Sequence, residues 1–354
     1  MNKKDYICAV PFTSLEMRKT RRYLCCDGWL KKHLPENSSP FDAWNSDEAN
    51  DIRNSMLDGS YRYCDSNICP FLHQLDTTGV VDGNSPIYHK NNIPKSILKI
   101  IDLHKLGKLN APRTIQFSFD DSCNLKCPSC RIDLIMANGK SIKLVKETIV
   151  DIQNTFGEYV EKLYITGTGD PFISVGFRDF LRNFDKTNWP NLKTIHLHTN
   201  ATRWDKKMWD SMKSIHKYVQ TCEISIDAGT KETYETKTRL GGNWDELIEN
   251  LKFISTLPSI KSVKPSFVVQ KHNYKEMKQF YDLMYSIFGN KVSVFFGKIT
   301  NWGTFSEEEY KSHQVWDPSH SEYSEFLKEL NRTLPAKNAF TNLQEFIEPH
   351  RGLI

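Results

Sequence analysis

The sequence has no long apolar run. A membrane-spanning helix needs about 18 or more consecutive apolar residues, and no segment of the 354 residues reaches that length. The N-terminal segment MNKKDYICAVPF carries two lysines but no apolar core of the kind that marks a signal peptide. We therefore expect no membrane segment and a cytoplasmic location.

A strong charge of one sign is also missing. The chain has 47 Lys and Arg residues against 43 Asp and Glu residues, which leaves a net charge of +4 without a clustered basic arm. Nucleic-acid-binding domains usually have a basic face, so nucleic acid is not expected as a partner. The chain is 39% hydrophobic and 25% charged, close to globular averages, so it can bury a sizeable core.

Cysteine is abundant by contrast. In a reducing cytoplasm, nine cysteines are expected as metal ligands rather than disulfides, and the odd number also argues against complete pairing. Eight of them fall into two groups, and the ninth is Cys222. The N-terminal group is Cys8, Cys25, Cys26, Cys64 and Cys69, and the central group is Cys123, Cys127 and Cys130.

Short β-rich segments alternate with amphipathic helical segments from about Thr114 onwards. Strands are expected at 114–119, 162–166, 193–199, 222–227, 265–270 and 292–296. Helices are expected near 142–155, 174–184, 205–216, 244–256 and 274–287. Such alternation indicates parallel strands with right-handed crossovers. We predict an α/β fold, a partial (β/α)6 barrel of the TIM type preceded by a small cysteine-rich cluster-binding domain. A doubly wound open sheet is the alternative.

The composition changes along the chain indicate four segments. They are a cysteine-rich domain at 1–72, a turn-rich connector at 73–112, the barrel at 113–302 and a C-terminal helical extension at 303–354. In the first segment we expect a helix over Asp47–Leu57 with Asp47 as its N-cap.

The central cysteines form a CxxxCxxC motif directly after the first expected barrel strand. Functional sites of parallel α/β folds collect in such loops. Structural zinc prefers four protein ligands, whereas three thiolates on a four-iron, four-sulfur cluster leave one iron without a protein ligand. A cofactor can bind there. A zinc site with a fourth ligand elsewhere is the alternative.

The segment CNLKCPSC resembles the defining motif of radical S-adenosylmethionine (SAM) enzymes. The resemblance implies that Cys123, Cys127 and Cys130 hold a 4Fe–4S cluster whose open iron binds SAM. It further implies that SAM is cleaved reductively to a 5′-deoxyadenosyl radical, which abstracts a hydrogen atom from a substrate carbon. Many members have an aromatic residue before the last cysteine, where this sequence has Ser129.

Later segments resemble the SAM-binding motifs of the same family. Thr168-Gly169-Asp170-Pro171 is similar to the Gly-Gly-Glu-Pro motif that contacts the SAM ammonium group, and Asn200 stands in a Thr-Asn-Ala version of Thr-Asn-Gly. Ser225 and Asp227, two residues apart and so expected to point the same way, resemble the pair that meets the methionyl or ribose part. Arg239 resembles an arginine that would pair with the SAM carboxylate. The alternatives are an ordinary strand-to-helix turn at Asp170 and an exposed loop arginine at Arg239.

Residues 8–70 resemble a SPASM or twitch module, which carries auxiliary clusters and normally follows the barrel. The shared features are Cys-x-x-Pro-Phe, a Cys-Cys pair and a closing cysteine pair. The resemblance implies a second 4Fe–4S cluster on Cys8, Cys64, Cys69 and one of Cys25 or Cys26, with Cys25 favoured. A closed zinc site on the same thiolates is the alternative.

The catalytic residues and the substrate are not specified by these motifs. Weak candidates for acid–base or hydrogen-donor roles are Cys222, Lys271, His272 and Lys298. The resemblance implies oxidation, epimerisation or crosslinking of a carbohydrate, peptide or small-molecule substrate, with a flavodoxin- or ferredoxin-type reductant. The competing hypotheses are a non-catalytic zinc-binding scaffold or binding module, and a radical SAM relative that acts on RNA, which the weak net charge disfavours.

Overall fold

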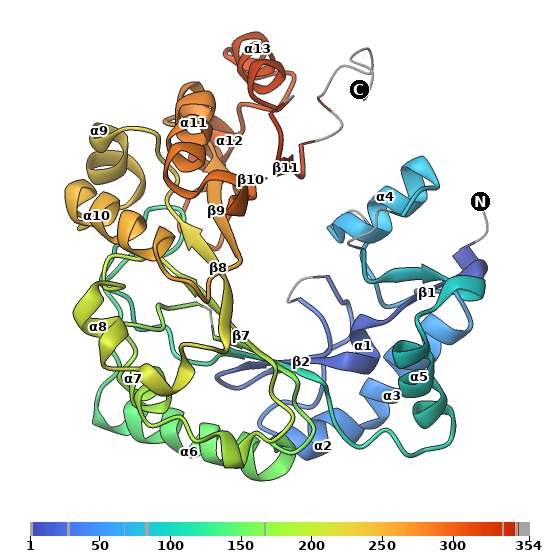
Figure 1. Ribbon diagram of the computed structural model, residues 1–354. Coiled ribbons are helices and arrows are strands. Elements are labelled where there is room, and N and C mark those ends of the chain that lie inside the picture. Colours follow the sequence, from blue (N-terminus) through green and yellow to red (C-terminus); the bar gives the residue numbers. More distant parts are fainter. Residues whose placement is uncertain are drawn as a thin grey trace. The chain divides into compact units, whose positions relative to one another are not determined.

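The computed structural model describes residues 3–26, 29–66, 68–81, 85–165, 168–334, 336–343 and 346. The chain divides into two compact units, and the helices and strands are labelled in Figure 1. The first unit is Met1–Asp120, Lys143–Ile165 and Asp185–Thr194. The second unit is Asp121–Ile142, Thr166–Phe184 and Ile195–Ile354.

The first unit contains a four-stranded arrangement in the order β3-β2-β5-β6. Its strands are β2 (Ser14–Arg18), β3 (Arg22–Tyr23), β5 (Thr114–Ser118) and β6 (Lys162–Ile165). Strand β5 pairs in parallel with β2 and β6, and β3 is antiparallel to β2. The N-terminal segment therefore contributes a parallel strand beside the first expected barrel strand, which the sequence pattern did not indicate.

Short elements surround the N-terminal cysteines. Strand β1 (Tyr6–Cys8) pairs antiparallel with β4 (Ile87–His89), and α1 (Val10–Thr13) packs on α3 and α5. The remaining helices of this region are α2 (Pro40–Asn45), α3 (Asp47–Leu57), α4 (Pro70–Thr78) and α5 (Lys95–Lys105). Helix α3 has the predicted bounds, but Ser46 rather than Asp47 is its N-cap, since the Ser46 side chain accepts from Ala49 N. Asp47 lies in the first turn, where its negative charge interacts favourably with the helix dipole.

The second unit contains five parallel strands in the order β7-β8-β9-β10-β11. They are β7 (Thr194–Thr199), β8 (Val219–Ser225), β9 (Ser262–Val269), β10 (Val294–Lys298) and β11 (Ala339–Thr341). Strand β11 adds to β10, so the C-terminal extension is not purely helical. The final strand is a feature that the sequence pattern did not indicate.

Helices follow the strands as the alternation predicts. They are α6 (Gly139–Phe156), α7 (Val175–Arg182), α8 (Lys206–Asp210), α9 (Lys231–Thr233), α10 (Trp244–Ser255), α11 (Met277–Phe288), α12 (Glu307–His313) and α13 (Tyr323–Thr333). Helix α8 is shorter than expected and is followed by a 3-10 turn at Lys213–Ile215. All six expected strands are present within a few residues of their predicted bounds, except that Thr166 lies outside the described residues.

The strands of the second unit have one apolar and one polar face. On β7, Ile195 and Leu197 are fully buried, whereas His196 and His198 are half-buried. On β8, Cys222 and Ile224 are buried, and Glu223 between them is half-buried. Helix α11 packs on β9 and β10, and the apolar faces form the core of this α/β unit. No helix in the described parts of the chain is long and apolar enough to span a bilayer.

Candidate cofactor site at the cysteine motif

The cysteine loop, defined here as residues 121–137, is held by main-chain hydrogen bonds. Cys127 O accepts from Cys130 N at 2.9 Å and from Arg131 N at 3.0 Å, which closes a turn between the last two cysteines. Cys123 N donates to Ile135 O at 2.9 Å. Cys123 and Cys127 are buried and Cys130 is exposed. The loop thus presents three thiols with one of them open to solvent.

Each of the three thiols accepts an N–H donor from a different side chain. Asn200 Nδ2 lies 3.6 Å from Cys123 Sγ. Arg239 Nη1 lies 3.5 Å from Cys127 Sγ, and Arg131 Nη2 lies 3.6 Å from Cys130 Sγ. Donors of this kind stabilise negative charge on sulfur, and hydrogen bonds to the sulfurs tune iron–sulfur clusters. The arrangement therefore fits three thiolates that share one cluster.

Burial acts against the thiolate form in the metal-free chain. It raises the pKa of Cys123, and the nearby Asp170 carboxylate adds to the shift. It also raises the pKa of Cys127, where Arg239 opposes it. Cationic iron would favour both thiolates over the thiols. Burial thus favours the neutral thiols in the metal-free chain, and iron would bind with release of their protons.

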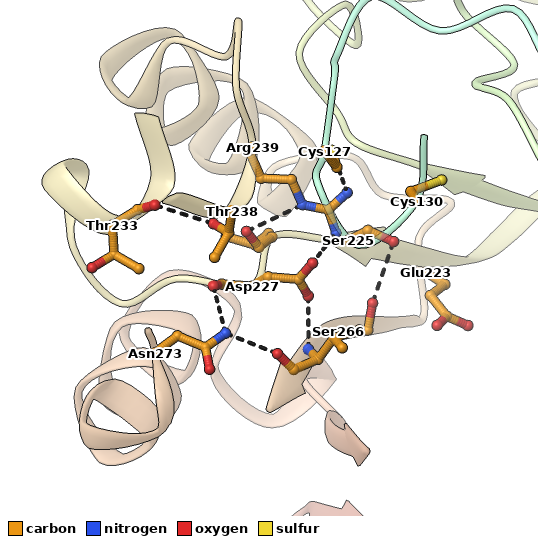
Figure 2. A network of polar contacts seen from close by, with 12 residues as sticks. Cys127, Cys130, Glu223, Ser225, Asp227, Thr233, Thr238, Arg239, Ser266 and Asn273 are labelled. Atoms are coloured by element: carbon orange, nitrogen blue, oxygen red, sulfur yellow. Dashed lines mark hydrogen bonds and ion pairs between the residues drawn. The ribbon is translucent and has the colours of Figure 1, made fainter. Parts of the chain in front are cut away.

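Arg239 joins the cysteine loop to the end of strand β8. Its Nη2 forms an ion pair with Asp227 Oδ2 at 2.6 Å, and both side chains are almost completely buried. Its Nε donates to Ile226 O at 3.4 Å, and Figure 2 shows the guanidinium between Asp227 and Cys127. Burial acts to lower the pKa of Arg239, but Asp227 and Cys127 outweigh it and raise the pKa. Arg239 is therefore a fixed cation beside the cysteine loop.

The backbone at Asp227 departs from the predicted strand. Strand β8 ends at Ser225, and Asp227 adopts a φ of 59°, in the left-handed region. The alternation expected to align Ser225 and Asp227 therefore does not reach Asp227. Asp227 Oδ1 accepts from Val268 N at 2.7 Å, and Asn273 Nδ2 donates to Asp227 O at 2.9 Å (Figure 2). These two hydrogen bonds help to hold the left-handed backbone conformation of Asp227.

Ser225 lies in a polar row across three strands. Its hydroxyl is 2.9 Å from His198 Nε2 and 3.4 Å from Ser266 Oγ. Glu223, on the same face, pairs with Lys264 at 2.6 Å and lies 4.0 Å from His198. Half-buried polar side chains thus line the face of the sheet opposite its apolar core.

Asp170 ties the loop after β7 to the cysteine loop. Its carboxylate accepts from Phe172 N at 2.9 Å, Thr199 Oγ1 at 2.7 Å and Asn200 N at 2.8 Å, and its own N donates to Ser122 O at 2.8 Å. A carboxylate has about four acceptor positions, so internal donors take most of them. Burial raises the pKa of Asp170, and these hydrogen bonds oppose the shift. The structure thus shows a positioning role for Asp170, and contact with SAM stays a prediction.

Thr168, Gly169 and Asn200, other residues of these two motifs, lie near Asp170 and the cysteine loop. Thr168 donates its hydroxyl to Asp121, and the Thr168 carbonyl accepts from Arg131. Gly169 is half-buried beside them. Asn200 Oδ1 accepts from Thr202 N at 2.9 Å and from Thr202 Oγ1 at 2.7 Å, which orients its amide toward Cys123. Of the predicted SAM-contact residues, Asn200 and Arg239 therefore contact the cysteine thiols, and Thr168 and Asp170 contact the cysteine loop.

Arg131 was not among the residues singled out from the sequence. The only signal available was its position directly after the last cysteine, which is compatible with any role. Its part in the site depends on where its side chain goes, since Nη1 donates to Asp121 O at 2.8 Å and Nη2 reaches Thr168 O and Cys130. Asn273 was also missed, because its role depends on side-chain contacts with Asp227, Val268 and Gln270 that the sequence does not show.

The weak catalytic candidates lie in different surroundings. Cys222 is 1% exposed on the apolar face of β8, and burial raises its pKa. Lys271 and His272 are exposed after β9, and the ring of His272 contacts that of His313 at 5.1 Å. Lys298 ends β10 and lies over the ring of Phe346 at 5.0 Å. The structure does not bring these four together.

The N-terminal cysteines gather in the first unit. Burial raises the pKa of Cys8 to about 12, with a further contribution from Cys64 and Cys69. Burial also raises the pKa of Cys25, with further contributions from Cys8 and Cys69. Cys26 is exposed, whereas Cys25 is half-buried. Four thiols thus share one neighbourhood, although in the described ranges no three Cys, His, Asp or Glu side chains are placed to hold a single metal ion.

Residues 118–284 match the family model of the Radical SAM superfamily. This segment contains the cysteine motif and Asp170, Asn200, Asp227 and Arg239. The match shows that this segment, which is slightly less than half of the chain, is similar to the radical SAM domain.

Several solved structures are similar to this chain over part of their length. SuiB of Streptococcus suis bound to precursor peptide SuiA is 17% identical with a TM-score of 0.44, and the match covers 76% of this chain and 59% of that chain. Native anSMEcpe with bound AdoMet is 19% identical with a TM-score of 0.42, covering 62% of this chain and 59% of that one. The chain thus spans about three fifths of the length of these two structures. Among curated proteins, no relative matches the sequence.

Proposed function

We propose that this protein is a radical SAM enzyme that abstracts a hydrogen atom from a carbon of a carbohydrate, peptide or small-molecule substrate, leading to oxidation, epimerisation or crosslinking. The observation that carries the proposal is the set of three N–H donors, one on each thiol of the CxxxCxxC loop. Such a set suits a cluster with three protein ligands and one open iron, where SAM would bind.

The bound cluster and SAM would supply the radical chemistry, and the protein residues would hold the reactants. Cys123, Cys127 and Cys130 would be the ligands. Asn200, Arg239 and Arg131 would fix the sulfurs and stabilise their charge. We place the SAM molecule next to Thr168, Gly169, Asp170, Asn200, Ser225, Asp227 and Arg239. The polar row formed by His198, Glu223, Ser225 and Lys264 would face the reacting molecules rather than the core.

We further propose a second 4Fe–4S cluster in the first unit, on Cys8, Cys25, Cys64 and Cys69. The shared neighbourhood of these thiols supports this ligand set, because Cys25 interacts with Cys8 and Cys69. Such a cluster would pass an electron to or from the substrate. A segment of this kind at 1–72 would be a SPASM- or twitch-like domain placed before the barrel.

The remaining organisation follows from this assignment. The parallel strands with βα alternation in each unit support a partial (β/α)6 barrel at 113–302, a connector at 73–112 and an extension at 303–354. A flavodoxin- or ferredoxin-type protein would supply electrons, and a cytoplasmic location suits the reducing conditions that clusters need.

The test is iron and sulfide content of anaerobically reconstituted protein, together with a dithionite assay for 5′-deoxyadenosine. About eight irons per chain with 5′-deoxyadenosine formed would support both clusters, and about four irons with activity would support the SAM cluster alone. Protein that binds zinc tightly, takes up no iron and cleaves no SAM would instead be the zinc-binding scaffold. That result would overturn the proposal.

A further inference from the structure

Arg131 makes contacts that connect the cysteine loop to the loop after β6. The side chain is 8% exposed. Its Nη1 donates to Asp121 O at 2.8 Å, and its Nη2 donates to Thr168 O and lies 3.6 Å from Cys130 Sγ. Two main-chain carbonyls thus orient the guanidinium, and a second N–H of Nη2 is directed at the Cys130 sulfur. Only a planar, forked cation can serve all three acceptors at once.

Cys130 is the thiol that packing restrains least. Cys123 and Cys127 are 8% and 3% exposed, so the packed chain around them already limits their motion. Cys130 is exposed and lies at the end of the loop. The following residues Ile132, Leu134, Ile135 and Met136 are exposed as well. Packing therefore does not hold the Cys130 side of the loop, and Arg131 is the buried group directly beside it.

We infer that Arg131 is a positioning residue that fixes the Cys130 thiolate and makes the bound cluster easier to reduce. The inference rests on the proposed function. Arg131 carries a permanent positive charge in a buried setting, where charges act more strongly than in water. Reduction adds one negative charge to the cluster, so a nearby cation stabilises the reduced form more than the oxidised form. Charge and hydrogen bonds at the sulfurs are established determinants of cluster potential.

The acidic groups around Arg131 do not cancel this effect. The Asp121 carboxylate accepts the Thr168 hydroxyl, whereas Arg131 uses the Asp121 main-chain carbonyl. The side-chain contacts given for Arg131 among the described residues are with the carbonyls of Asp121 and Thr168 and with Cys130 Sγ, and none is with a carboxylate. The positive charge is thus directed at the sulfurs.

The first measurement is an EPR-monitored redox titration of the SAM cluster in a chain whose auxiliary site is disabled by Cys64→Ala. In this background, we compare Arg131→Gln, Arg131→Lys and the matched control Arg182→Gln, an exposed arginine of α7 that contacts Ser211. We expect Arg131→Gln to lower the ratio of reduced to oxidised cluster about tenfold at a fixed solution potential. This corresponds to a reduction potential that is about 59 mV lower. Arg131→Lys should keep a potential close to that of the parent, because it keeps the charge.

The second measurement is the rate of iron release to a chelator. Both Arg131 variants should lose iron severalfold faster than Arg182→Gln, because neither glutamine nor lysine can serve both carbonyls and the sulfur. A potential and a release rate equal to those of Arg182→Gln would overturn the inference. If Arg131→Gln does not fold, unchanged iron release from Arg131→Lys is sufficient to overturn the positioning role. A parent chain that takes up no iron would instead defeat the proposed function itself.

Discussion

Three side chains act on one sulfur each, and they differ in what they contribute. Asn200 is a neutral donor held by Thr202, so it directs Cys123 without adding charge. Arg239 and Arg131 are cations on Cys127 and Cys130. Arg239 is neutralised by Asp227, whereas Arg131 is held by carbonyl groups. The full positive charge is therefore concentrated beside Cys130.

At the residue scale, Cys127→Ala should reduce 5′-deoxyadenosine formation to background in the dithionite assay. The change removes one of the three proposed cluster ligands, at a residue that is 3% exposed. The cost in unfolding free energy should stay near 1–2 kcal/mol, because only one buried atom is removed. Cys222→Ala is the matched control and should retain SAM cleavage. Full cleavage by Cys127→Ala would disprove the assignment of the cysteine loop.

We expect His198 to make the stability of the chain depend on pH. Burial lowers its pKa, although the nearby Glu223 opposes the shift. The unfolded chain takes up a proton near pH 6.5 while the folded chain resists it, so the unfolded state binds more protons and stability falls with pH below about 6.5. The loss between pH 7.5 and 5.5 should be at most about 1.4 kcal/mol for this residue.

The measurement is urea unfolding of the metal-free protein at both pH values. His198→Gln should lose less stability on acidification than the parent, since the titrating group is gone. His73→Gln removes an exposed histidine of α4 and should behave like the parent. Equal pH dependence of His198→Gln and the parent would show that His198 titrates alike in the folded and unfolded chain.

At the scale of elements, the segment after β8 is held by side chains from the segment after β9. Glu276 accepts from Gly229 N at 2.7 Å and from Thr230 N at 3.1 Å. Asn273 donates to Asp227 O and to Val268 O, and its Oδ1 accepts from Gln270 N. Beyond Ser225, where β8 ends, these side chains thus add to the main-chain hydrogen bonds from Ile226 N and Asp227 N to Ser266 O.

Asn273→Ala should destabilise this connection and weaken SAM binding. The residue is 1% exposed, and the change removes its hydrogen bonds to Asp227 O, Val268 O and Gln270 N. We expect a loss of about 2–4 kcal/mol in the free energy of unfolding, measured with urea. Asn290→Ala, at an exposed position, is the matched control and should change stability by less than about 0.5 kcal/mol. A loss no larger than that of the control would contradict the role assigned to Asn273.

A second element-scale constraint is the loop after Arg239. Lys126 N donates to Leu240 O at 2.9 Å, which joins this loop to the cysteine loop. Gly241 has a φ of 88°, and a Cβ at Gly242 would lie 2.5 Å from the ring of Tyr234. The two glycines therefore allow the close approach that places Arg239 beside Cys127.

At the scale of the whole molecule, the two cysteine groups belong to different compact units. We therefore expect each site to bind its cluster independently of the other. Cys64→Ala should remove about four irons per chain and spare part of the SAM cleavage, measured by iron and sulfide analysis and the dithionite assay. Cys26→Ala is the matched control and should keep the parent iron content. An unchanged iron count in Cys64→Ala would refute the auxiliary site, and loss of iron in Cys26→Ala would assign the ligand role to Cys26.

The sequence alone was sufficient to predict the six βα units and the cysteine motif. Both depend on residues that are close along the chain, namely the alternation of apolar side chains and the spacing of Cys123, Cys127 and Cys130. Helix α3 was placed within its correct bounds for the same reason. Local patterns determine local structure, because the interactions involved span only a few residues.

Only the tertiary structure decided which groups meet the sulfurs. Asn200 is 77 residues from Cys123 and Arg239 is 112 residues from Cys127, so these contacts depend on strand order and on loop conformation. The left-handed backbone of Asp227, the parallel strand β2 and the direction of the Arg131 side chain were equally hidden. Each results from packing between segments distant in the chain, which no periodicity or spacing records.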